Sequence, residues 1–446
     1  MIILMLFIFI LFIIIAYFKG KRNLLSPWFL LCSMFLITYS IVLFNYKNWE
    51  VRINEKFVLY ISTALIAFGI GTLLINKTQV CKSNNRCTSI WNYNDLEFQF
   101  KYPVNILMFA SLAFAFGYVY KLFSDVSGAG SLTEMLRKIY DNRINEQYTP
   151  GFIFNQMSEI VRAIAYLNTY KLFLRFYSKT DKTSFIKIFI PILVLLITAL
   201  ISTDRNIFLR YGIYFVCLWM FFYYNHCKSK NVNGRIIIGI IVIGVIIFIL
   251  FYIMGKMKLY GSSFSRALSI YGGSGLYNFN LWLETFDEPL KYGQSTFTQF
   301  LDSVGVLLKF IGVDLHGSVE KVDAYIKFTS SNGYVYSSNI YSALKPYVED
   351  FGYFGVIFFP FIMGVCYQFL FLKAKKSKCG FSWIAYSLLI YPIIFFPILE
   401  QLFRRFHFGF VYEVGWLTIL YLFVFVRNKY KICRNKRVTL GGTQKC

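Results

Sequence analysis

Apolar runs of about twenty residues recur along this chain, and they restrict its fold more than any other feature. A helix needs about 20 apolar residues to cross the hydrocarbon core of a bilayer. Hydropathy predicts about eleven such helices, centred on residues 2–18, 27–45, 57–75, 104–122, 152–175, 186–203, 206–224, 236–254, 352–372, 382–400 and 408–426. We therefore predict an all-α polytopic membrane protein.

The composition excludes a water-soluble globular protein. Of the 446 residues, 57% are hydrophobic and only 15% are charged, too few to cover a soluble surface of this size. The net charge of +24 raises the question of whether the protein binds nucleic acid. The Lys and Arg residues, however, form short clusters at the ends of the apolar runs, and no basic and aromatic module of a known kind is present. We predict no nucleic-acid partner, and a lipid bilayer as the surroundings.

The basic clusters predict the orientation of the chain. They fall in alternate connections, such as "KGKRN", "SKTDKTS" and "LKAKKSKCG", and in the tail "RNKYKICRNKR". Such connections stay in the cytoplasm. The cysteines outside the apolar runs fall in the same set, which fits reduced thiols. The amino terminus is therefore predicted outside and the carboxyl terminus inside.

This orientation divides the chain into four parts. Residues 1–254 hold eight membrane helices, residues 351–426 hold three more, and residues 427–446 form a basic cytoplasmic tail. Residues 255–350 form one large external loop, in which short amphipathic stretches predict short helices. A connection of this length is usually functional, so we expect it to lie over the outer mouth of the helix bundle.

Polar residues gather at the predicted outer ends of the helices. They are Arg205, Arg210, Arg266, Asn339, Tyr341, Glu349, Asp350, Arg404, Arg405 and His407. They are either interface anchors or parts of a binding site. Arg210 favours a site, because an arginine near the centre of a span costs about 2.5–3.5 kcal/mol unless it faces a polar cavity or a partner.

Glu159 and Arg162 raise the same question inside the fifth span. Three residues apart, they share one helix face. The pair is either a structural ion pair, or Arg162 lines a path for substrate.

A diphosphate beside the membrane would explain several arginines. Guanidinium groups bind phosphate in a bidentate manner and stay charged. A carboxylate or a histidine nearby, with Glu349, Asp350 and His407 as candidates, would accept a proton from an attacking hydroxyl group. No D-x-D motif occurs on the outer side, so we predict a reaction without metal and without a cofactor.

Three stretches carry a resemblance to a known family: "STDRNIFL", "YGQSTF" and "NIYSALKPYVEDFGYFG". Together with the topology they resemble the O-antigen polymerases of the Wzy type, which are oligosaccharide repeat-unit polymerases. The matched positions are Arg205, Asn339, Tyr341, Asp350, Gly352 and Gly355. The family's pattern of Arg, ten residues and Gly is met only by Arg404 and Gly415, which we regard as a chance match because Gly415 would lie inside a helix.

The resemblance implies a bundle and an activity like those of the GT-C glycosyltransferases. The protein would act at the periplasmic face of a bacterial inner membrane in the biosynthesis of lipopolysaccharide or a related surface polysaccharide. It would transfer a growing glycan from undecaprenyl diphosphate to a lipid-linked repeat unit, with a chain-length regulator as a further partner. The expected catalytic residues are Arg205, Asp350, Glu349 and His407. The expected substrate-binding residues are Arg210, Arg266, Asn339, Tyr341, Arg404, Arg405 and Arg162.

Two other functions stay open on these grounds. An O-antigen ligase has the same chemistry and a different acceptor. A flippase for the lipid-linked oligosaccharide would transport it without reaction, and we would expect two related halves and no large outer loop.

Overall fold

The structure is a computed structural model. It describes residues 1–80, 102–126, 128, 130–144, 150–177, 183–226, 234–256, 264–310, 324–331, 333–377, 380–403 and 408–426. The chain divides into two compact units, each assembled from segments that are distant in sequence. Unit 1 comprises Met1–Cys87, Gly261–Ser377 and Leu389–His407, and unit 2 comprises Thr88–Tyr260, Lys378–Leu388 and Phe408–Cys446. The residues predicted as one external loop thus fold mainly with the first helices, in unit 1.

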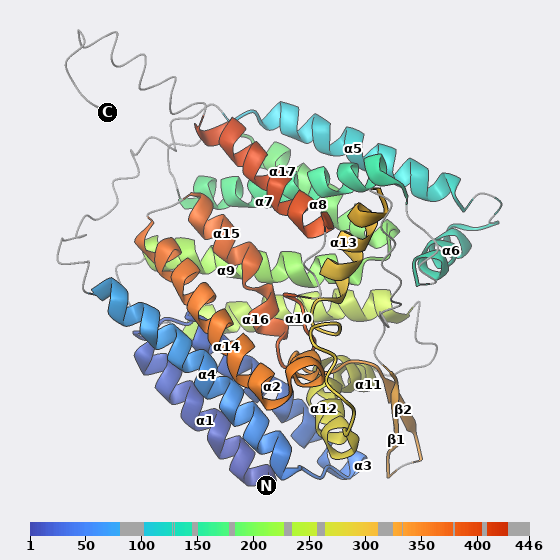
Figure 1. The fold of residues 1–446 in the computed structure, drawn as a ribbon. Helices are drawn as coiled ribbons and strands as arrows, with labels where there is room; N and C mark the ends of the chain where they lie inside the picture. The colour runs from blue at the N-terminus through green and yellow to red at the C-terminus, as the bar shows by residue number, and fades with distance from the viewer. Residues whose placement is uncertain are drawn as a thin grey trace. The chain divides into compact units, whose positions relative to one another are not determined.

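Unit 1 is built on four long helices that lie side by side (Figure 1): α1 (Ile2–Lys19), α2 (Pro27–Phe44), α4 (Glu55–Val80) and α14 (Leu344–Lys376). Shorter elements join them: α3 (Tyr46–Trp49), α11 (Phe264–Leu268), the π-helical turn η2 (Ser269–Gly273), α12 (Ser274–Thr285), α13 (Thr298–Phe310) and α16 (Tyr391–Phe395). The strands β1 (Ile326–Thr329) and β2 (Val335–Ser338) complete the unit.

Unit 2 surrounds one interior helix, α7 (Phe152–Tyr177), whose side chains from Ala163 to Leu174 are all buried. Four helices pack directly against it: α5 (Val104–Ser124), α8 (Phe185–Ile201), α9 (Arg205–His226) and α17 (Phe408–Tyr421). The unit also contains α6 (Leu132–Ile144), α10 (Gly234–Lys256), α15 (Phe381–Leu389) and the π-helical turn η3 (Leu422–Val426).

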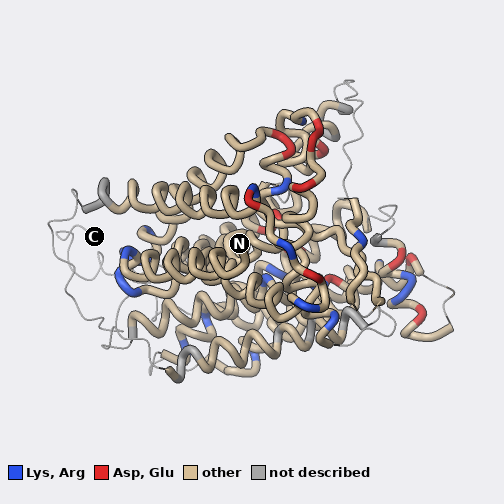
Figure 2. The backbone as a smooth tube through the Cα atoms, turned by 90° about the horizontal axis from the view of Figure 1, so that it is seen from below, with Lys and Arg blue, Asp and Glu red and all other residues tan. Residues whose placement is uncertain are grey.

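The chain is an all-α multi-pass membrane protein, as predicted. Each of the eleven predicted ranges overlaps a helix, and the range 382–400 covers two short helices, α15 and α16, with the turn that follows them. Figure 2 shows long helical stretches that carry no charged residue. Among the described residues, seven helices are long and apolar enough to cross a membrane: Ile2–Lys19, Pro27–Phe44, Glu55–Asn76, Val104–Ser124, Arg205–Asn225, Leu344–Lys376 and Phe408–Phe425. Two further apolar helices, Phe185–Ile201 and Phe381–Phe395, are shorter.

Two elements were not predicted. The connection after α5 contains α6, which begins with a capping box: the Glu134 N–H donates to Ser131 Oγ at 3.2 Å, and the Gly130 N–H donates to Glu134 Oε2 at 3.0 Å. This second bond and Lys138 lower the pKa of Glu134. The segment of residues 255–350, which was predicted to be external, contains an antiparallel hairpin, with Phe328 opposite Tyr336. The prediction of short helices alone was therefore incomplete.

Helices α4 and α14 approach each other closely because glycines face backbone atoms across the contact. A Cβ atom at Gly364 would overlap the carbonyl group of Phe68, and one at Gly71 would overlap the carbonyl oxygen of Phe361. Small residues allow such backbone contact between membrane helices, where van der Waals packing drives association.

We expect Gly364→Ala to destabilise the protein, because the added methyl group forces the two backbones apart. Overpacking of this kind costs about 1–3 kcal/mol, which thermal unfolding in detergent would detect. Gly415→Ala is the matched control, because a Cβ atom there meets open space on α17. Equal unfolding temperatures for the two variants would contradict the proposed contact.

Candidate functional site

The candidate site in unit 1 is built around a break in α14 at Gly352. Its φ of 57° and ψ of −142° are not helical, and a positive φ favours glycine. Three residues later, a Cβ atom at Gly355 would overlap the carbonyl oxygen of Tyr347. These glycines therefore let α14 fold back on its own preceding turn. The close approach of α14 to a neighbouring helix is made further along, at Gly364.

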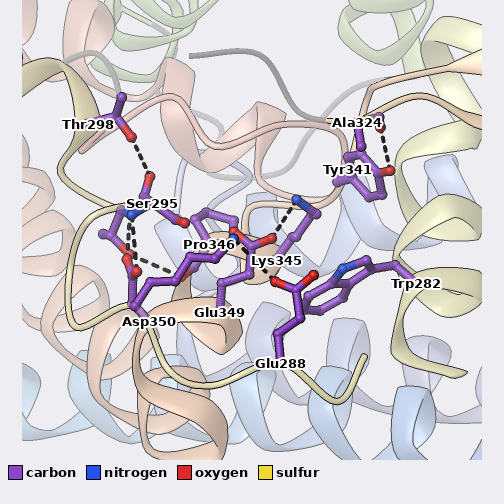
Figure 3. A network of polar contacts seen from close by, with 12 residues as sticks. Trp282, Glu288, Ser295, Thr298, Ala324, Tyr341, Lys345, Pro346, Glu349 and Asp350 are labelled. Carbon is purple, nitrogen blue, oxygen red and sulfur yellow. Dashed lines mark hydrogen bonds and ion pairs between the residues drawn. The ribbon is translucent and has the colours of Figure 1, made fainter. Parts of the chain in front are cut away.

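The carboxylate of Asp350, just before this break, is fully buried and holds a turn of the external segment. Its Oδ1 accepts a hydrogen bond from the Ser295 N–H at 3.0 Å, and its Oδ2 accepts one from the Thr296 N–H at 2.5 Å (Figure 3). The Tyr292 N–H also donates to the Asp350 carbonyl oxygen at 3.2 Å. Two of the stretches that carried the family resemblance, "YGQSTF" and "NIYSALKPYVEDFGYFG", thus bind each other directly.

Glu349 lies in a second buried contact beside the first. Lys345 Nζ donates to Glu349 Oε1 at 2.7 Å, and both side chains are nearly inaccessible. The Lys345 ammonium group lies 4.6 Å from the ring centroid of Tyr341 and 5.5 Å from that of Trp282 (Figure 3). The aromatic faces stabilise a cation that has lost its water, so the pair is a compact unit of buried charge.

The external segment is attached to the helices through α12. Asn278 Nδ2 donates to the Ile340 carbonyl oxygen at 2.8 Å, beside the predicted residue Asn339. Asn280 Nδ2 donates to the Arg52 carbonyl oxygen at 2.9 Å, and Asn280 Oδ1 accepts a bond from the Asn54 N–H at 2.9 Å. The amides of α12 therefore fix both the connection before α4 and the stretch that leads into α14.

Glu400, buried in the same unit, organises the turn that follows α16. Its Oε1 accepts hydrogen bonds from the Tyr347 hydroxyl group at 3.1 Å and from the N–H groups of Leu402 at 2.8 Å and Phe403 at 3.0 Å. This turn leads toward Arg404, Arg405 and His407, three predicted site residues that lie outside the described residues.

Arg266 holds the hairpin. Its Nη2 donates to the Val335 carbonyl oxygen at 3.0 Å. Its guanidinium carbon lies 5.8 Å from the ring centroid of Tyr334 and 5.4 Å from that of Tyr336. These contacts give Arg266 a structural role, and its predicted contact with substrate stays a prediction.

Unit 2 contains the other predicted arginines. Arg205 is the first residue of α9, and Asp204 caps this helix by accepting the Asn206 N–H at 3.1 Å. Arg205 and Arg210, one and a half turns further on, are both half-buried. Arg205 and Arg210 belong to unit 2, whereas Asp350 and Glu349 belong to unit 1.

Glu159 and Arg162 form an ion pair, which is one of the two alternatives considered from the sequence, with Arg162 Nη1 2.8 Å from Glu159 Oε1. Glu413 of α17 and Asp204 also lie near enough to act electrostatically on the guanidinium group. Because acidic side chains already surround Arg162, its contacts favour the structural alternative over the substrate path.

The predicted site contained neither Lys345 nor Trp282, although Lys345 lies among the polar residues that precede the ninth predicted span. A signal for Lys345 was available, because it precedes Glu349 by four residues and shares its helix face. Trp282 had no such signal, because its place beside Lys345 results from long-range packing. Among the described residues, no group of three His, Cys, Asp or Glu side chains is placed to hold a metal ion.

Comparison with known proteins found no relative of this chain. No family model matches the chain, and neither the curated proteins nor the solved structures contain a match.

Asp350→Asn tests the buried carboxylate. The new NH₂ group must face one of two N–H donors, so we expect a loss of about 1–3 kcal/mol in unfolding free energy. Asp287→Asn is the control, because Asp287 is exposed in the same external segment. A variant at 350 that unfolds like the control would contradict the structural role, and if it also lost activity it would restore the catalytic one.

Proposed function

We propose that this protein is a metal-independent glycosyltransferase that polymerises undecaprenyl-diphosphate-linked oligosaccharide repeat units at the periplasmic face of the bacterial inner membrane. The observation that carries the proposal is the direct contact of the two stretches on which the resemblance rests. The carboxylate of Asp350 binds the N–H groups of Ser295 and Thr296. The resemblance depends on residues that are far apart in the chain, and these residues contact each other in the folded protein.

The proposed reaction needs a cation at the leaving group and a base at the acceptor. A hydroxyl oxygen of the acceptor sugar forms a bond to the anomeric carbon of the donor. The bond from that carbon to the diphosphate oxygen breaks, and the diphosphate leaves with the electron pair. Arg205 and Arg210 are proposed to bind the diphosphate, since guanidinium groups stabilise charge that develops there.

The hydroxyl proton passes to a base, for which Glu349 and His407 are the proposed candidates. Glu349 is held in place by its buried ion pair with the Lys345 ammonium group. The contacts of Asp350 favour a positioning role, because both carboxylate oxygens already accept backbone hydrogen bonds. Asn339 and Tyr341 are proposed to line the substrate site near the break in α14. Arg404 and Arg405 are proposed to contact the diphosphate.

Arg205→Ala is expected to abolish long-chain glycan while single repeat units are still attached. A hydrogen bond to a charged group contributes about 1.5–3 kcal/mol, enough to lower the transfer rate by roughly ten- to a hundredfold. The measurement is the ladder of glycan lengths on the cell surface. Arg137→Ala on α6, an exposed position, is the control, and an intact ladder in the Arg205 variant would remove this residue from the site.

The purified protein is expected to retain transfer activity in EDTA, because positive side chains take the place of a metal ion at the diphosphate. Polymer length is followed with lipid-linked repeat units as the only substrate. Loss of activity that Mg²⁺ restores would disprove the metal-independent mechanism.

A further inference from the structure

The interior helix of unit 2, α7, is polar along most of its length. Its charged and amide side chains extend from Glu159 to Arg175. Sixteen residues of helix span about 24 Å, most of the roughly 30 Å of a hydrocarbon core. α7 is not among the described helices apolar enough to cross a membrane, although its neighbours α5, α9 and α17 are. Because this helix carries polar side chains and is enclosed by apolar helices, the interior of unit 2 contains polar groups.

These polar side chains form three successive groups. At one end, Glu159 and Arg162 form the ion pair described above. In the middle, the hydroxyl groups of Thr169 and Tyr211 lie 2.7 Å apart. At the other end, the Lys171 ammonium group, 2% exposed, lies 5.4 Å from the ring centroid of Tyr102.

α9 adds a further hydroxyl group to the middle of this series. Tyr214 is fully buried, and its hydroxyl group donates to the Tyr166 carbonyl oxygen at 2.9 Å. The rings of Tyr211 and Tyr214 both contact that of Tyr166. Hydroxyl groups from two helices therefore line the interior between the charged groups at the two ends.

Several buried polar atoms along this line have no hydrogen-bond partner among the described residues. They are Arg162 Nε, Asn168 Oδ1, Arg175 Nη1 and the Tyr102 hydroxyl group. Leaving such an atom unsatisfied costs about 1–3 kcal/mol. Internal water is the usual partner of buried polar groups in this position. Water between the three groups would join them into one hydrogen-bonded chain.

We propose that unit 2 conducts protons along α7. A proton enters on a carboxylate of Glu159 or Glu413 and passes through water and the hydroxyl groups of Thr169 and Tyr211 toward Lys171. The Lys171 ammonium group releases one of its own protons at the far side and is then reprotonated from this chain. No covalent bond is made and no other ion moves. Ionisable side chains inside membrane helices commonly mark such relays.

The charged and titratable groups that face the outer end of this path come from four places. They are Tyr118 of α5, Glu159 and Arg162 of α7, Asp204 of the turn between α8 and α9, and Glu413 of α17. Arg162 keeps its proton, so it holds the carboxylates in place and does not carry the proton itself.

The test is proton flux into liposomes that contain the purified full-length chain. A pH gradient is imposed, the membrane potential is clamped with potassium and valinomycin, and a pH-sensitive dye is enclosed. Thr169→Val and Tyr211→Phe each remove a hydroxyl group with little change of shape. We expect each to lower the flux roughly tenfold, which corresponds to about 1.4 kcal/mol on the barrier.

Thr198→Val on α8 is the matched control. Its hydroxyl group is also buried in unit 2 and, like that of Thr169, donates to a carbonyl oxygen of its own helix, which is that of Val194 for Thr198 and that of Ala165 for Thr169. Thr169 differs by its further contact with the Tyr211 hydroxyl group. The control should conduct like the unmodified chain. Flux equal to that of protein-free liposomes would overturn the proposal, as would equal flux in the Thr169, Tyr211 and Thr198 variants, with unfolding temperatures measured to confirm folding. The assay contains no glycan, so its outcome is independent of polymerase activity.

Discussion

Unit 1 depends on one buried carboxylate. Asp350 accepts two backbone hydrogen bonds from the Ser295–Thr296 turn, and it does so immediately before the non-helical residue Gly352. One helical stretch of α14 ends there, and the chain continues beyond Gly352 as the long apolar stretch of the same element. A charged acceptor held by two N–H groups is a strong way to fix such a break, because an unpaired carboxylate there would be very costly. The external segment is thus tied to α14 where the helix is interrupted.

The remaining contacts of unit 1 strengthen this arrangement. The pair of Lys345 and Glu349 occupies the preceding turn and is enclosed by the rings of Tyr341 and Trp282. The amides of Asn278 and Asn280 bind backbone groups on either side. Buried polar groups are stable only when their partners are supplied, and here the external segment and the first helices supply them to each other. This mutual dependence explains why residues distant in sequence fold as one unit.

The arginines show how far the type of a residue predicts its role. Arg205 was predicted from the sequence to be catalytic, and Arg162 and Arg266 were predicted to bind substrate. In the structure Arg162 is enclosed by acidic groups and Arg266 contacts two tyrosine rings. Arg205 opens a helix at a turn, a position suited to binding an anion. The same guanidinium group stabilises an ion pair or a hairpin according to its neighbours, which no local pattern specifies.

Two elements that were not predicted have local sequence signals, which a hydropathy plot does not detect. The helix α6 begins within the stretch "SLTE", which has the Ser-x-x-Glu spacing of a capping box. The hairpin contains Asn-Gly between two short runs rich in aromatic and β-branched residues, a frequent turn signal. A search for membrane spans overlooks both, because neither element is long or uniformly apolar.

The sequence by itself determined that this is a helical membrane protein and where most helices lie. Burial of apolar side chains in lipid depends on a run of about twenty residues, which is a local property. Only the tertiary structure decided that the segment between α10 and α14 belongs with the first helices, that Asp350 binds the Ser295–Thr296 turn, and that α7 is enclosed. Those outcomes depend on hydrogen bonds and packing between residues far apart in the chain, and no local periodicity records which partner a buried polar group will find.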